Sequence, residues 1–183
     1  MTTIAITVVG LTPLLCNRPT DVPVEGNPRQ LAEARLYLDH DLRPVIPQIN
    51  LLRCLLNAGR CLDRDPAELI HSLGIRESQL LIIADSGWTL DSRTVRDPAS
   101  GVRRPCHRPR FDAWALRFHL ELDDEMLATE SAHRLIEFAG QRVGLGDFRP
   151  ERNGPHGRFA IDRWDDVTLA ATDRPTPALV SAR

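Results

Sequence analysis

The stretch Ala113-Trp114-Ala115-Leu116-Arg117-Phe118-His119-Leu120-Glu121-Leu122 alternates between two kinds of residue. The even-numbered positions hold Trp, Leu, Phe, Leu and Leu, whereas the odd-numbered ones hold Ala, Ala, Arg, His and Glu. A period of two is typical of a β-strand that has one buried face and one open face. We therefore predict an antiparallel sheet that is covered on one side only.

The sequence on both sides of this strand supplies the other elements. We predict strands at 3–9, 79–84 and 158–164, long helices at 49–62 and 125–143, short helices at 31–35 and 66–73, and a small hairpin at 36–47. The long elements follow the βαββαβ order of an α+β, ferredoxin-like (RRM-like) fold. We expect a single domain over residues 1–164, with a tail over 165–183 that is flexible or docks on a neighbour.

Charge is unevenly distributed along the 183 residues. All 23 basic residues are arginine, and against 25 acids they leave a net charge of −2, which excludes a uniformly basic nucleic-acid-binding surface. Residues 93–110 nevertheless contain six arginines and one acid, whereas residues 112–137 contain seven acids and two arginines. We predict that residues 86–112 form an irregular basic ribbon inserted between the central strands, and that the acids receive arginines of a neighbouring copy. The alternative is an ordinary solvated loop beside an ordinary solvated helix.

A second cluster of unusual residues lies between the predicted helix at 125–143 and the last strand. It contains Gly144, Gly146, Gly154 and Gly157 together with Arg149, Arg152 and Arg158. The segment is not a Rossmann fingerprint and not a Walker A motif, because it follows a helix and has no Gly-Lys-Ser/Thr. Glycines would let the backbone approach a ligand, and the arginines would contact phosphates. Asp147 beside Arg149 suggests an ion pair that stabilises the loop.

The helix at 49–62 is apolar around most of its circumference and has one polar stripe. The stripe consists of Asn50, Arg53, Asn57, Arg60 and Arg64, at steps of three and four residues. Arg53 and Arg60 are therefore candidates for anion binding, and the alternative is a solvated stripe without a ligand.

The glycine-rich segment resembles the glycine-rich loop of the RAMP superfamily of CRISPR-associated proteins, with a slightly stretched spacing. Gly10-Leu11-Thr12-Pro13-Leu14 and Pro44-Val45-Ile46-Pro47 also resemble segments of that superfamily. Within it, the chain is most similar to Cas7-like backbone subunits, although it is shorter than most of them. It is also similar to uncharacterised phage and prophage proteins that have the same glycine-rich ending.

This resemblance implies a non-catalytic subunit that oligomerises along single-stranded guide RNA, beside other subunits of a ribonucleoprotein, with single-stranded DNA as an alternative target. With few aromatic residues, the chain suits backbone-directed binding that is largely independent of sequence. The candidate RNA-binding residues are Arg93, Arg96, Arg103, Arg104, Arg108, Arg110, Gly144, Gly146, Arg149, Arg152, Gly154, Gly157, Arg158, Arg53 and Arg60.

Other functions stay open at this point. A RAMP-type endoribonuclease would use a histidine such as His156 or His119 as general base, and a phage structural or host-interaction protein would reuse the fold. Cys106-His107 lacks partners at zinc-like spacing, so we expect no metal and no cofactor. The absence of a signal peptide and of a long apolar run favours a cytoplasmic protein with reduced cysteines and no membrane span.

Overall fold

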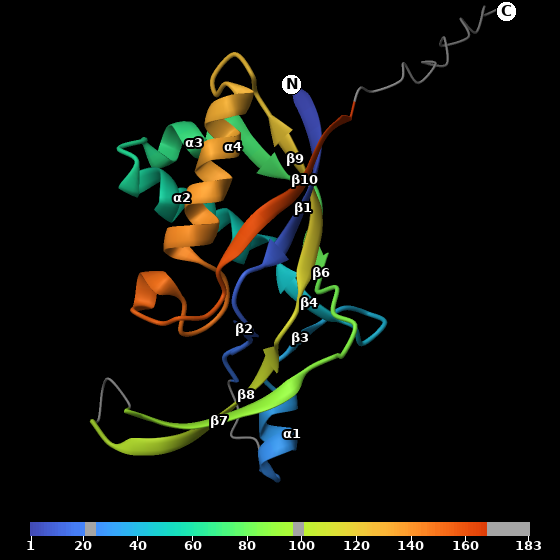
Figure 1. Ribbon diagram of the computed structural model, residues 1–183, viewed down its shortest axis with the longest axis vertical. Coiled ribbons are helices and arrows are strands. Elements are labelled where there is room, and N and C mark those ends of the chain that lie inside the picture. The colour runs from blue at the N-terminus through green and yellow to red at the C-terminus, as the bar shows by residue number, and fades with distance from the viewer. Residues whose placement is uncertain (21–24, 97–100, 168–183) are drawn as a thin grey trace, which may run out of the picture.

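The largest sheet has four antiparallel strands (Figure 1). The computed structural model describes residues 1–20, 25–96 and 101–167. The strands, in their order across the sheet, are β10 (Phe159–Val167), β1 (Thr2–Gly10), β9 (Ala115–Leu122) and β5 (Leu73–Ile75). Along the chain they are the fourth, first, third and second strands of this sheet, which is the order of a ferredoxin-like core. The predicted α+β fold is confirmed.

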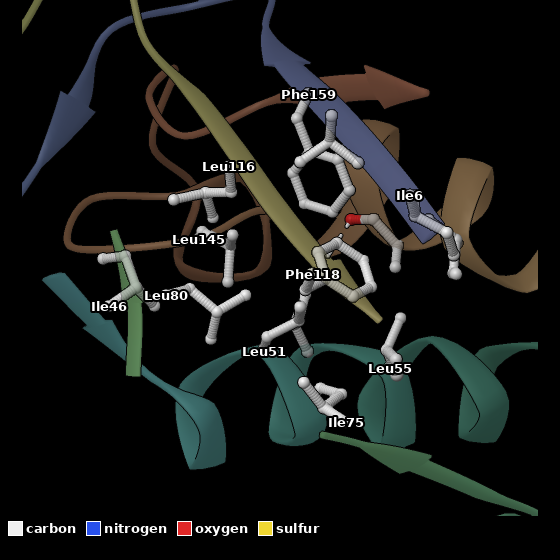
Figure 2. Packing of buried hydrophobic residues seen from close by; sticks show 14 of the residues in the cluster. Ile6, Ile46, Leu51, Leu55, Ile75, Leu80, Leu116, Phe118, Leu145 and Phe159 are labelled. Carbon is white, nitrogen blue, oxygen red and sulfur yellow. Dashed lines mark hydrogen bonds between the residues drawn. The ribbon is translucent and has the colours of Figure 1, made fainter. Parts of the chain in front are cut away.

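Three helices cover one face of this sheet (Figure 1). They are α2 (Gln48–Cys61), α3 (Pro66–Ser72) and α4 (Thr129–Phe138). Between the layers, Leu51 and Leu55 of α2 project toward Phe118 of β9, and all three side chains are fully buried (Figure 2). Each such side chain contributes about 1.5–3 kcal/mol to stability through burial.

The opposite face of the sheet carries the other half of the alternating residues. Arg117 is exposed, and His119 and Glu121 are half-buried, whereas Leu116 and Leu120 on the helix side are fully buried. The predicted alternation is therefore confirmed.

The second strand of the core differs from the prediction. Residues 79–84 were expected to form it, but the ladder with β9 is made by β5 (Leu73–Ile75), and the predicted segment contributes only an isolated bridge between Ile83 and Ala115. Strand β5 has only three residues, of which Leu73 and Ile75 are buried, so it is too short to show a period in the sequence. The apolar run at 79–84 contributes β6 (Gln79–Leu81) to a separate small sheet with β3 (Tyr37–Leu38) and β4 (Pro44–Pro47). The predicted hairpin at 36–47 is confirmed in that sheet.

The basic ribbon is more regular than predicted. It consists of β7 (Thr89–Arg96) and β8 (Arg103–Phe111), which form a continuous antiparallel ladder and extend away from the main sheet (Figure 1). Pro105 and Pro109 lie four residues apart on β8, so their backbone nitrogens, which carry no N–H group, point to the same edge of that strand. Only this one edge of β8 therefore lacks the two donors. The short strand β2 (Leu14–Leu15) pairs with the base of β8, and helix α1 (Pro28–Glu33) lies beside it. Residues 97–100 lie outside the described residues.

Two element boundaries also shift. Helix α4 begins at Thr129 rather than at residue 125, because Asp123 organises a turn in which its carbonyl oxygen accepts hydrogen bonds from the N–H groups of Met126 and Leu127. The helix continues as a π-helical turn, Ala139–Val143. Strand β10 reaches Val167, so the first three residues of the predicted tail pair with β1, and residues 168–183 lie outside the described residues.

No helix among the described residues is long and apolar enough to cross a membrane.

Candidate nucleic-acid interface

Strand pairing divides the side chains of the ribbon between two faces, because opposed residues share a face and the faces alternate along each strand. One face carries Asp91, Arg93, Arg104, Arg108 and Arg110, and the other carries Arg96 and Arg103. We call residues 89–93 with 106–111 the ribbon root, and residues 94–96 with 103–105 the outer ribbon.

In the ribbon root, carboxylates neutralise the arginines. Arg108 is only 4% exposed, and its guanidinium lies 3.1 Å from Asp91 Oδ2 and 2.7 Å from Asp147 Oδ2. Burial lowers the pKa of Arg108, but the hydrogen bond to Asp147 and the nearby charges outweigh it and raise this pKa. The side chain therefore remains charged. Arg110 pairs with Asp112 at 2.5 Å. Arg108 therefore joins the ribbon to the glycine-rich segment, and Asp147 pairs with Arg108 rather than with Arg149 as the sequence suggested.

The outer ribbon is different. Arg96, Arg103 and Arg104 are exposed, and within the described part of the chain none of them has a carboxylate partner. Arg96 and Arg103 lie directly opposite each other, and opposed like charges destabilise a ladder. Arg96 Nε donates a hydrogen bond to a backbone carbonyl at 3.1 Å. The outer ribbon thus holds positive charge that a polyanion would neutralise.

The glycine-rich segment packs on itself and on the chain that follows β1. The N–H of Leu145 donates to the carbonyl of Gly157 at 2.9 Å, and the N–H of Gly157 donates to Pro13 at 2.8 Å. A Cβ atom at Gly154 would lie 1.8 Å from the carbonyl oxygen of Phe148, and one at Gly157 would lie 1.8 Å from that of Leu145. The close approach is therefore to the protein's own backbone, whereas the sequence led us to expect approach to a ligand.

The arginines of this segment have different environments. Arg149 pairs with Glu151 at 2.6 Å, and it also donates to the carbonyl of Gly146 at 3.0 Å. Arg152 and Arg158 are exposed, and neither has a carboxylate partner among the residues that the structure describes. Two of the three predicted arginines are therefore available to an anion.

A pocket of about 250 Å³ lies where the glycine-rich segment meets α2, β3 and β4. It brings together four of the predicted residues, because Gly144, Gly146 and Arg149 line it from one side and Arg53 lines it from α2. Arg60 lies two turns farther along α2, is exposed, and donates a hydrogen bond to a neighbouring asparagine at 3.2 Å. The stripe on α2 therefore contributes Arg53 to the pocket, whereas Arg60 is not among the lining residues.

Two thiols also line this pocket. Cys16 and Cys54 are both buried, and burial raises the pKa of each to about 12. Both thiols are therefore protonated and neutral near pH 7. All four cysteines of the chain are free.

His156 lies between the ribbon root and the glycine-rich segment. It is 6% exposed, and its Nε2 accepts a hydrogen bond from Arg93 Nη2 at 3.2 Å, while Arg93 Nε donates to Asp91 at 2.7 Å. Burial, followed by the charge of Arg93, lowers the pKa of His156. This histidine is therefore neutral and already serves as an acceptor within the protein.

His119 lies elsewhere, on the open face of the main sheet. The carboxylate of Glu77 accepts two hydrogen bonds from His119, one from its backbone N–H at 2.9 Å and one from its ring Nδ1 at 2.5 Å. Burial raises the pKa of Glu77, but these hydrogen bonds outweigh burial and lower the pKa below its ordinary value. The two histidines that we considered as general bases do not share a site.

Among the described residues, one group of side chains is close enough to hold a metal ion, and it consists of Asp39, His40 and Asp41 in the turn between β3 and β4. Asp39 already accepts hydrogen bonds from two backbone N–H groups and from the guanidinium of Arg43. The carboxylate oxygens of Asp39 are thus already hydrogen-bonded, and the three residues stabilise the turn rather than form a metal site.

Sequence reasoning missed Asp91 and the pocket residues, and it paired Asp147 with the wrong arginine. Asp91 and Asp147 both neutralise Arg108, and for Asp91 the nearby arginines in the sequence were the available signal. Tyr37 and Asn50 line the pocket, and Asn50 is the first residue of the polar stripe on α2. No local pattern marks Tyr37.

No protein-family model and no curated protein matches the sequence. A chain in the cryo-EM structure of the Type III-B Cmr-beta complex bound to cognate target RNA is 10% identical, with a TM-score of 0.62 over 90% of this chain and 60% of that one. This chain thus spans about three fifths of that protein's length.

Two further solved structures are similar. Cmr6 from Pyrococcus furiosus is 11% identical, with a TM-score of 0.50 over 86% of this chain and 97% of that one. A chain of a Type IV-B CRISPR complex is 13% identical, with a TM-score of 0.50 over 96% of this chain and 94% of that one. These neighbours are RAMP, Cas7-like proteins. The chain therefore has the fold of RAMP, Cas7-like subunits of CRISPR complexes, which confirms at the level of the fold the resemblance carried by its glycine-rich segment.

Proposed function

We propose that this chain is a non-catalytic subunit that binds the backbone of single-stranded RNA, largely independently of sequence, within a CRISPR-type ribonucleoprotein. The observation that carries this proposal is the outer ribbon. Arg96 and Arg103 oppose each other on one face and Arg104 lies on the other face, and none of the three has a carboxylate partner in the described part of the chain. A polyanion bound there would relieve this repulsion.

Arginine suits this partner chemically. Its planar guanidinium donates two parallel hydrogen bonds to a phosphate and also stacks on a base. Direct contacts are assigned to the exposed arginines, namely Arg96, Arg103 and Arg104 of the outer ribbon, Arg152 and Arg158 of the glycine-rich segment, and Arg53 and Arg60 of α2. Arg93, Arg108, Arg110 and Arg149, which are ion-paired, instead hold the ribbon and the glycine-rich segment in place.

The partners in this proposal come from the structural neighbours. One neighbour is part of a complex bound to target RNA, and another is part of a Type IV-B CRISPR complex. By analogy, this chain would bind guide RNA beside further copies of itself and other subunits. Electron microscopy should show ordered oligomers of the purified chain only when single-stranded RNA is present.

The absence of catalysis in this proposal rests on His156. A general base needs a free lone pair within reach of the proton that it removes. The Nε2 lone pair of His156 is occupied by Arg93, and the ring is buried. His119 has a carboxylate partner but lies on the open sheet face, where the neighbouring arginines are Arg76 and Arg117 rather than ribbon residues. Labelled RNA should therefore be recovered intact after incubation with the protein.

The proposal is tested by reversing charge on the outer ribbon. The double variant Arg103→Glu/Arg104→Glu should weaken binding of a labelled uridine homopolymer about tenfold or more, and should reduce the slope of log affinity against log salt by about 1.4, as expected for two lost phosphate contacts on a single strand. Fluorescence anisotropy across a salt series measures both quantities.

The matched control is Arg117→Glu/Arg134→Glu, which changes the net charge equally on the open sheet face and on α4. It should leave the slope close to that of the wild type. Equal losses in the two double variants would show attraction by net charge alone and would refute a binding surface on the ribbon. Failure of the wild-type chain to bind any single-stranded RNA would refute the proposed function.

A further inference from the structure

The pocket beside the glycine-rich segment has a floor that is neutral and apolar. Ile46 and Leu145 belong to the hydrophobic core drawn in Figure 2, and each is at most 3% exposed. Cys16 and Cys54 complete the floor as protonated thiols. A phosphate seated on such a floor would lose its hydration without gaining donors, which is costly. The floor instead suits a flat, uncharged ring.

The rim of the pocket is polar and partly unoccupied. Asn17 and Asp147 also line the pocket, but they are hydrogen-bonded to each other at 2.9 Å, and Asp147 is ion-paired with Arg108. Tyr37, Asn50 and Arg53 complete the rim, and none of these three side chains makes a hydrogen bond or ion pair with another residue of the described ranges. Arg149 is committed to Glu151 and to a backbone carbonyl, as described above. The free groups therefore comprise one hydroxyl, one amide that both donates and accepts, and one cation.

These groups differ in what they recognise. The amide of an asparagine forms paired hydrogen bonds with adenine, donating to N7 and accepting from the N6 amino group. The Arg53 guanidinium suits the phosphate attached to such a base. A hollow with an apolar floor and a few polar groups at its rim is the usual form of a small-ligand site.

We infer that this pocket receives one unstacked nucleobase of the bound strand, with Asn50 reading its edge and Arg53 holding its phosphate, and that adenine fits best. The inference rests on the proposed function, and it adds one position of base preference to binding that is otherwise independent of sequence. Proteins that recognise single-stranded RNA by sequence commonly bind splayed bases in this way.

The test compares two RNAs of equal length, an all-uridine strand and the same strand with one central adenosine. The wild-type chain should bind the adenosine-containing strand about fivefold or more tightly, within the range of discrimination by one paired contact. Asn50→Ala should abolish that difference, so that the two strands bind with equal affinity. Arg53→Met should weaken binding of both strands.

The control is Asn57→Ala, the same substitution two turns along the same helix, at an amide that bonds to Glu151 and does not line the pocket. It should retain the preference for adenosine. Tyr37→Phe is a second pocket variant, which keeps the ring and loses the hydroxyl, and it should reduce the preference. Circular dichroism melting should show that all four variants are folded.

The possible outcomes separate the two claims. Equal affinity of the wild type for both strands, or a preference that survives in Asn50→Ala, would overturn the base pocket and leave RNA binding standing. Binding of neither strand would instead overturn the proposed function. A strand with 2-aminopurine in place of the adenosine gives an independent readout, because this base lacks the N6 amino group that Asn50 reads, and the wild type should therefore lose its preference.

Discussion

The ribbon root and the outer ribbon are built from the same two strands and the same basic residue, yet their arginines differ in environment. Arg104 and Arg108 lie on the same face of β8, four residues apart. Arg108 is buried between Asp91 and Asp147, whereas Arg104 is exposed and has no carboxylate partner in the described part of the chain. The side chain itself therefore does not decide its role.

The difference shows that carboxylates, rather than arginines, define the interface. An acid that approaches from another segment turns an arginine into a structural cation, and the arginines without such an acid are left for a ligand. The glycine-rich segment supplies the acid for the root through Asp147. The ribbon and this segment therefore form one unit, on which the outer ribbon is mounted.

The largest expected effect comes from removing the cation of the root. Arg108→Met should lower the free energy of unfolding by about 3–5 kcal/mol, because it leaves the buried carboxylate of Asp91 and its partner Asp147 without their shared cation. Urea denaturation followed by circular dichroism measures the loss.

Arg104→Met is the control for that prediction, since it makes the same change on the same face. It should alter the free energy of unfolding by less than about 0.5 kcal/mol, as is usual for exposed positions. Similar losses in the two variants would contradict the distinction between root and outer ribbon.

A smaller effect is expected from the loop on which the root docks. Gly157 has a φ angle of 73°, and a Cβ atom there would lie 1.8 Å from the carbonyl oxygen of Leu145. Gly157→Ala should therefore cost about 2–4 kcal/mol, through left-handed strain together with overpacking. Denaturation in urea again measures the cost.

Gly87 separates the two contributions. Its φ angle is 63°, but an added Cβ would have no heavy atom within 4 Å. Gly87→Ala should thus cost only about 1–2 kcal/mol, which is the backbone strain alone. If both alanine variants lost equal stability, the tight packing of the glycine-rich segment would not matter.

The sequence predicted those parts of the fold whose signals are local and long. The alternation of β9, the β-branched residues of β1 and the apolar helix α2 each extend over enough residues to show a period. Strand β5 has three residues, and its pairing with β9 brings together positions more than forty residues apart in the chain. Such a strand is set by tertiary contacts, which a sequence pattern does not record.

The candidate site was predictable to a similar degree. The ribbon and the glycine-rich segment stand out by composition, but nothing in the sequence shows that Asp147 faces Arg108, 39 residues away along the chain. The sequence likewise placed Arg53 on the polar stripe of α2 but did not reveal the pocket, because the pocket forms only where Tyr37, from the small sheet of β3, β4 and β6, meets α2. Sequence reasoning found the right segments, and the structure was needed to separate paired arginines from free ones.

The smallest expected effect is a pH dependence that arises at His156, between the ribbon root and the glycine-rich segment. His156 is neutral in the folded protein, because burial and the nearby charges hold its pKa below the ordinary value of 6.5. The groups that contribute to this field are Arg93, Asp91, Arg110 and Arg108. Since the unfolded chain takes up a proton at a higher pH than the folded chain does, stability should decrease as the pH falls below about 6.5.

The measurement is urea denaturation at several values between about pH 7.5 and about pH 5.5, for the wild type and for His156→Gln. Glutamine keeps an acceptor for Arg93 but does not titrate, so the variant should show a flatter dependence of stability on pH. Glu77, whose pKa is also lowered, contributes only at pH values near and below 4.5 and does not interfere. Arg104→Met, in the outer ribbon, should follow the wild-type curve, and parallel curves for wild type and His156→Gln would show that the root does not sense pH through this histidine.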